Sequence, residues 1–180
     1  MNRKKINEKH LQKLLKTYQD FANIIDNSIE IKKGKIWQSI PLFNEIYIPV
    51  PSKQFYEKSI QDFLNSVYVK LPKEEKDIVD IIPYYIWSFL HEMGHVQNYD
   101  IKDPFISIRK ITDFLSYYFG HISIIDKLTT YLYFNLKEEK RATQWAINYV
   151  NENYDLVRLY SNEITKAYLK YYGNYNPTKC

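Results

Sequence analysis

Two histidines four residues apart constrain this chain more than any other feature. They are the first and last residues of the run HEMGH, residues 91–95. This run follows Pro83 and an apolar stretch at residues 84–90. Proline is favoured in the first turn of a helix, and side chains at i and i+4 lie on one helix face. The pattern therefore predicts a buried helix to about residue 98, with both imidazoles on one face. The rest of the fold must pack around that face.

This run also indicates metal chemistry. The pattern HExxH on a helix is typical of metallopeptidases, in which His91 and His95 would bind one zinc ion. Glu92 would then be the catalytic general base, taking a proton from a water that zinc activates. A catalytic zinc ion normally has three protein ligands and one open position. The sequence must therefore supply a third ligand from another segment.

The best segment for that ligand is 138–146, EEKRATQWA. Its apolar residues recur at helical spacing and predict a helix over 136–152. Glu138 and Glu139 flank the apolar face at its N-terminal end. A carboxylate turned toward a core is costly unless it is paired or bound to a metal. Helical geometry alone does not separate the two glutamates, and His121 is a third candidate.

A family resemblance separates them. HEMGH followed by Glu139-x-x-Ala142-x-x-Trp145-Ala146 resembles the ImmA/IrrE-like zinc metallopeptidases of bacteria, phages and mobile elements, which are gluzincin-like enzymes. The resemblance implies a zincin-like core with Glu139 as the third zinc ligand. It also implies an endopeptidase acting on a protein substrate, such as a DNA-binding repressor or another regulator. The chain departs from the family in the long gap between its two motifs and in lacking Leu-Met-Pro after the alanine.

Two alternatives remain open. The SprT-like proteases, which act on DNA-linked proteins, use a Gly-His ligand after HExxH, and Gly120-His121 resembles it without the usual Pro and Phe. If His121 is not a ligand, it could stabilise an oxyanion, as could Tyr99, one turn beyond His95. A different class is a non-catalytic zinc-binding module with a regulatory or virion-associated role. Glu92 favours an enzyme, because a structural zinc site needs no base.

The remaining segments predict an α+β fold that is mostly helical, in one domain over residues 1–180. Residues 6–26 have the spacing of an amphipathic helix. Residues 29–50 contain short β-branched and aromatic runs, Ile36-Trp37 and 46–48, which predict a small antiparallel sheet with Pro49 on an edge strand. Residues 70–76 are predicted to be a polar connector. Further helices are expected at 53–70, after Ser52 as N-cap, and at 105–119, 122–134 and 155–172.

Composition bounds the partners and the compartment. The net charge is +4, but the basic residues form no stripe, so direct nucleic-acid binding is not supported. The single cysteine, Cys180, excludes an intrachain disulfide and fits a reducing compartment. The N-terminus lacks an apolar signal segment, and no run is long enough to span a bilayer. We therefore expect a cytoplasmic protein without membrane contact; the sequence does not give its oligomeric state.

Overall fold

The computed structural model describes residues 3–50, 71–99 and 136–172, with scattered positions between 115 and 132; for residues 3–7 it describes the backbone alone. The helix expected at 53–70 lies outside the described residues, and only scattered positions of those expected at 105–119 and 122–134 are described. The described part is mostly helical with a small sheet in the first third. Its α-helices are α1 (Arg3–Ile25), α3 (Lys73–Val79), α4 (Tyr84–Gln97), α7 (Lys137–Glu152) and α8 (Tyr154–Tyr172).

The sheet has three short strands, β1 (Glu30–Gly34), β2 (Gln38–Ile40) and β3 (Glu45–Pro49). Their order is β1-β3-β2, with β1 parallel to β3 and β2 antiparallel to it. The 3-10 turn η1 (Pro41–Phe43) and Asn44, which has a left-handed φ of 53°, reverse the chain between β2 and β3. The predicted sheet is therefore present, but it is mixed rather than antiparallel.

Two details of the sheet prediction were wrong. Ile36 and Trp37 lie in the connection between β1 and β2 rather than in a strand. Pro49 ends the central strand rather than an edge strand. The physical reason is local: β2 pairs with β3 only as far as Tyr47, so at Pro49 the strand has one neighbour. A residue without an N–H group is tolerated at such an end.

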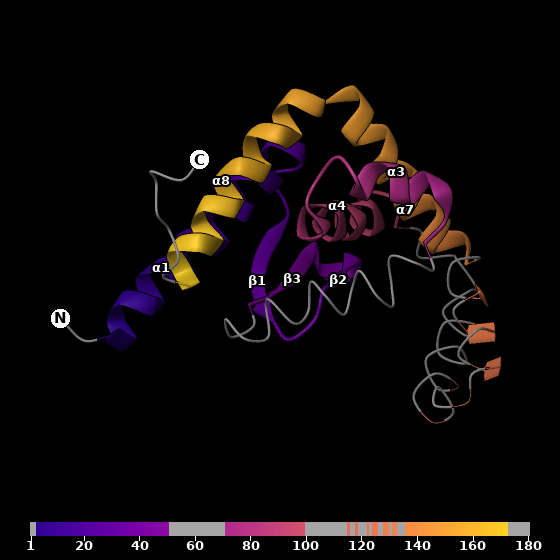
Figure 1. Ribbon diagram of the computed structural model, residues 1–180, viewed down its shortest axis with the longest axis horizontal. Helices are drawn as coiled ribbons and strands as arrows, with labels where there is room; N and C mark the ends of the chain where they lie inside the picture. Colours follow the sequence, from indigo (N-terminus) through magenta and orange to yellow (C-terminus); the bar gives the residue numbers. More distant parts are fainter. Residues whose placement is uncertain are drawn as a thin grey trace.

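The first and last helices pack together. Figure 1 shows α8 running alongside α1, and α4 lying between the sheet and the apex where α7 meets α8. The predicted apolar face of α1 is buried at Leu14, Tyr18, Phe21 and Ala22. The ring of Phe21 stacks on that of Tyr160 from α8, with centroids 4.6 Å apart. Non-local aromatic contacts of this kind hold the outer helices to the core.

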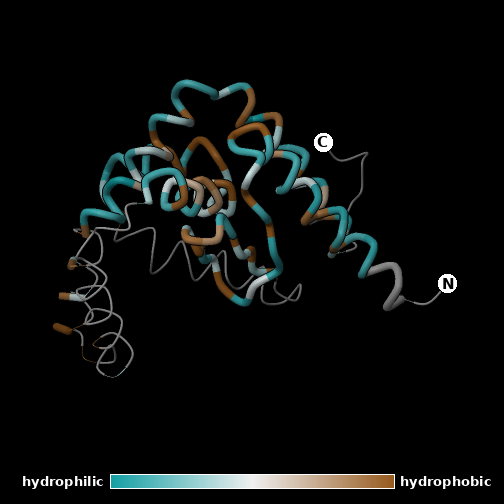
Figure 2. The backbone as a smooth tube through the Cα atoms, turned by 180° about the vertical axis from the view of Figure 1, so that it is seen from behind, coloured by the Kyte–Doolittle hydropathy of each residue, from teal (hydrophilic) through white to brown (hydrophobic). Residues whose placement is uncertain are grey.

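The central helix, α4, is the most apolar of the long described helices, and Figure 2 shows brown, hydrophobic segments in the middle of the fold. It contacts β2, β3 and α7, and Ile86, Phe89, Leu90 and Met93 are fully buried. Burying each such side chain contributes about 1.5–3 kcal/mol, so α4 is firmly held where the histidines emerge. Across the described residues, no helix has the length and apolar character needed to cross a membrane.

The segment predicted as a polar connector is partly helical. Helix α3 begins at Lys73 directly after Pro72, with Glu74 and Glu75 in its first turn. Acidic residues at a helix N-terminus are favoured by the helix dipole, and proline is tolerated beside that end. Helix α3 packs against α7 and α4. This packing buries Glu75, which is 4% exposed.

Candidate metal centre

Three side chains converge between α4 and α7. Nε2 of His91 lies 3.0 Å from Oε2 of Glu139 and 3.2 Å from Nε2 of His95. Nε2 of His95 lies 3.4 Å from the same glutamate oxygen. Among the described residues, these three form a group that could hold a metal ion, since one ligand atom from each lies within 4.8 Å of the others. The structure thus brings together the two motif histidines and Glu139.

Local structure explains the convergence. His91 and His95 are one turn apart on α4, and their rings meet edge to face with centroids 4.8 Å apart. Glu139 is in the first turn of α7, on the face that also buries Ala142 and Ala146. Its exposure is 1%, whereas the neighbouring Glu138 is half-buried. The packing of α7 therefore distinguishes Glu139 from Glu138 by burial, which the helical pattern alone did not do.

Glu139 and His91 each shift the pKa of the other within this buried group. Burial on its own would raise the pKa of Glu139, but hydrogen bonding to His91 and His95 and their positive charge hold that pKa well below its ordinary value. Burial would lower the pKa of His91, but hydrogen bonding to Glu139 and the charges of Glu139, Glu92 and Glu75 raise it. The negative carboxylate of Glu139 and a positive charge on His91 therefore stabilise each other.

A metal ion fits this donor set. Buried carboxylates and imidazoles are costly to desolvate unless they are paired or bound to a cation. Two imidazole nitrogens and one carboxylate oxygen, which lie 3.0–3.4 Å from one another, are ligands that first-row divalent ions accept. On binding, the cation would replace the proton that His91 shares with Glu139.

The other predicted site residues are placed less closely. Glu92 is half-buried, and its negative charge contributes to raising the pKa of His91. Tyr99 lies just beyond α4 with its side chain 41% exposed, and the described contacts do not join it to the three ligands. His121, the alternative ligand, lies outside the described residues. Its part in the site stays a prediction.

Two residues that the sequence did not single out, Thr143 and Glu75, lie on the Nδ1 side of His91. The hydroxyl of Thr143 lies 3.3 Å from Nδ1 of His91 and donates to Oε1 of Glu75 at 3.2 Å. Burial raises the pKa of Glu75, opposed in part by the positive charge of His91 and the bond from Thr143. Thr143 could have been found from its position one turn after Glu139 on the same helix face.

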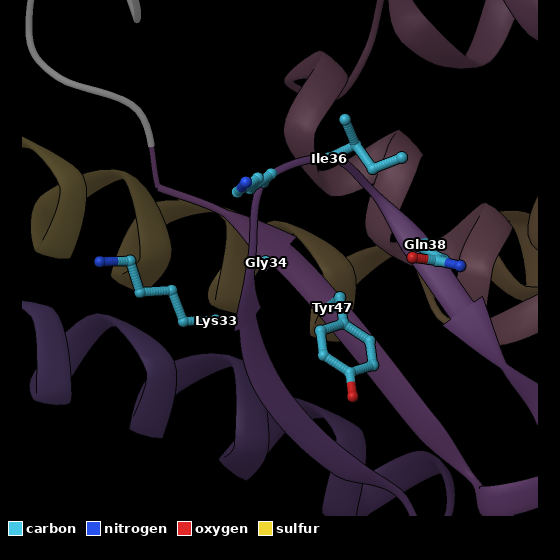
Figure 3. Close-up of a pocket in the computed structure, with 6 residues that line it drawn as sticks. Lys33, Gly34, Ile36, Gln38 and Tyr47 are labelled. Carbon is cyan, nitrogen blue, oxygen red and sulfur yellow. The ribbon is translucent and has the colours of Figure 1, made fainter.

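A hollow lies away from these residues, at the connection between β1 and β2. Figure 3 shows Gly34, Ile36, Gln38 and Tyr47 around it, with the side chain of Lys33 to one side. Its lining contains no histidine, cysteine or carboxylate. The group on α4 and α7 is therefore the stronger candidate for chemistry.

No family model, curated protein or solved structure matches this chain. The site must accordingly be interpreted from its own residues.

Proposed function

We propose that the protein is a zinc-dependent endopeptidase, with one zinc ion held by His91, His95 and Glu139 and with Glu92 as the general base. The observation that carries the proposal is the spacing of the three ligand atoms, which lie 3.0, 3.2 and 3.4 Å apart. No other group of such ligands is found in the part of the chain that the structure describes.

Simple geometry supports zinc. Zinc–nitrogen and zinc–oxygen bonds are about 2.0–2.2 Å long, so neighbouring ligands of a tetrahedral ion lie roughly 3.3–3.5 Å apart. The observed separations are close to that value and need little rearrangement. Three protein ligands leave a fourth position for water or substrate, as catalytic zinc sites require.

The role of Glu92 follows from its neighbours. It directly follows the first ligand and is half-buried. When bound, zinc would supply Lewis acidity, lowering the pKa of a water toward about 7 and polarising a carbonyl group. Glu92 would accept the proton of the attacking water and later deliver it to the leaving amine. A purely structural site has no use for such a carboxylate.

The family proposal rests on the motifs. Glu139, Ala142 and Ala146 share the buried face of α7 that the ImmA/IrrE-like resemblance implies. This favours an enzyme of that kind, with a zincin-like core and a cytoplasmic regulator or repressor as substrate. The SprT-like alternative would need His121 as third ligand, and the contacts of Glu139 with both histidines support Glu139 in that role.

Substrate profiling tests this function. Zinc-reconstituted protein is incubated with a denatured protein mixture, and new peptide ends are mapped by mass spectrometry. We expect ends that appear with zinc, disappear with a chelator and return when zinc is restored. A protein that binds zinc but yields no zinc-dependent ends from the mixture or from candidate repressors would favour the non-catalytic module.

A further inference from the structure

The side chains of Thr143 and Glu75 form a series of hydrogen-bond contacts that begins at Nδ1 of His91. Glu75 comes from α3, Thr143 from α7 and His91 from α4, so the chain of contacts joins three helices. The Thr143 hydroxyl donates to Oε1 of Glu75 at 3.2 Å and lies 3.3 Å from Nδ1 of His91. None of these contacts involves Nε2, the His91 atom that faces Glu139 and His95.

Proton counting fixes the direction of these bonds. A threonine hydroxyl has a single proton to donate but can accept further bonds. When the hydroxyl donates its hydrogen bond to Glu75, it can only accept one from His91. Nδ1 of the ring must therefore carry a proton. A neutral imidazole with its proton on Nδ1 has its lone pair on Nε2. This is the tautomer that a metal ligand bound through Nε2 needs.

Glu75 is placed for this task rather than for ligation. It is 4% exposed, so its burial requires a polar partner. It is not among the three residues whose ligand atoms cluster. Its recorded hydrogen bond is to Thr143, which points to a supporting role behind the site.

We propose that Glu75 and Thr143 are positioning residues: the Thr143 hydroxyl accepts a hydrogen bond from Nδ1–H of His91 and donates one to Glu75, which fixes the ring orientation and tautomer that present Nε2 to the metal. The inference rests on the proposed metal site and adds to it a support that reaches α3. Removing outer groups that orient a ligand typically weakens metal binding by about 10–100-fold.

The test compares two substitutions at one position. Thr143→Val keeps the shape of the side chain and removes the hydroxyl, whereas Thr143→Ser keeps the hydroxyl. Zinc dissociation constants are measured on the full chain by chelator competition. We expect Val to weaken binding about 10–100-fold and Ser to stay within a few-fold of wild type. Thr165→Val on α8, which removes a hydroxyl bonded to Tyr85 and to the Ser161 carbonyl, is the matched control and should not change affinity.

A structural role and a positioning role give different results. If Thr143 only stabilised the fold, metal-free Thr143→Val would lose thermal stability in step with its loss of affinity, and the Thr165→Val control would behave alike. If Thr143 and Glu75 act together as a hydrogen-bond relay to His91, their substitutions should not be independent. Glu75→Gln should weaken zinc binding in the otherwise wild-type chain but add little in the Thr143→Val variant. Additive losses would overturn the relay.

The inference can fail separately from the proposed function. Wild type that binds zinc, with Thr143→Val binding it equally well, would overturn the relay and leave the metal site standing. Wild type that binds no zinc would overturn the metal site and the relay with it.

Discussion

A β-carbon added to Gly94 would lie 2.4 Å from the carbonyl oxygen of Ala142 and 2.8 Å from its Cα. The backbones of α4 and α7 therefore meet where only a glycine fits. Gly94 directly precedes His95, a proposed zinc ligand, and Ala142 follows Glu139 by three residues. The close crossing of the two helices is what brings a glutamate on α7 to the histidines on α4.

We expect Gly94→Ala to push α7 away from α4. Overpacking a tight contact costs about 1–3 kcal/mol, against which alanine recovers at most about 1 kcal/mol of helix propensity. The contact atoms belong to backbone, so they cannot move aside as a flexible side chain would. Zinc affinity should fall together with thermal stability, as measured by chelator competition and circular dichroism. Lys140→Ala, on the exposed face of α7, should change neither; an unaffected Gly94→Ala variant would show that the crossing is not needed.

The assignment of the third ligand predicts a difference between adjacent glutamates. Glu139→Ala should weaken zinc binding by more than the roughly 100-fold loss typical of an outer-sphere group, because it removes a direct ligand. Glu138→Ala and His121→Ala should bind zinc nearly as wild type does. Equilibrium dialysis of the three variants gives the comparison. Strong loss in His121→Ala with retention in Glu139→Ala would favour the SprT-like alternative.

Replacing Glu92 by glutamine should separate binding from catalysis. Positioned general bases contribute about 10²–10⁴-fold, so cleavage should fall by at least that factor while zinc content is unchanged. Glu138→Gln makes the same chemical change nearby on α7 and serves as the control, with activity retained. Undiminished cleavage by the Glu92 variant would remove this carboxylate from the mechanism.

A separate prediction concerns acid stability at the C-terminal end of α4, where Gln97 contacts Asp26. Asp26 accepts bonds from the side chain and backbone of Ser28 and from Gln97, at 2.6, 2.9 and 2.9 Å, which lower its pKa from 3.8. A lowered folded-state pKa contributes stability that is present above the unfolded value and lost as pH falls through the folded one. Asp26→Asn should therefore be less stable than wild type near neutral pH, and the two should converge below pH 3.8. Urea melts across this range measure the difference; a constant difference would contradict it.

Sequence reasoning reached the helices that carry the ligands because their signals are local. Pro83 indicates the start of α4. Apolar residues that recur at helical spacing over many residues indicate α7 and α8. The parallel pairing of β1 with β3 was not predictable in this way, because strands of three to five residues have little periodicity and β1 is largely polar. Glu75 was missed for a similar reason. It lies in a short, charged helix, and its hydrogen-bond partner, Thr143, is 68 residues away in the sequence.

The most direct test of the account is a crystal structure of the zinc-reconstituted protein, with anomalous scattering recorded at the zinc edge. We predict one zinc peak per chain, about 2 Å from Nε2 of His91, Nε2 of His95 and a carboxylate oxygen of Glu139. A fourth position should be open to water. Absence of zinc from this place, or a zinc ion held there without Glu139, would contradict the account.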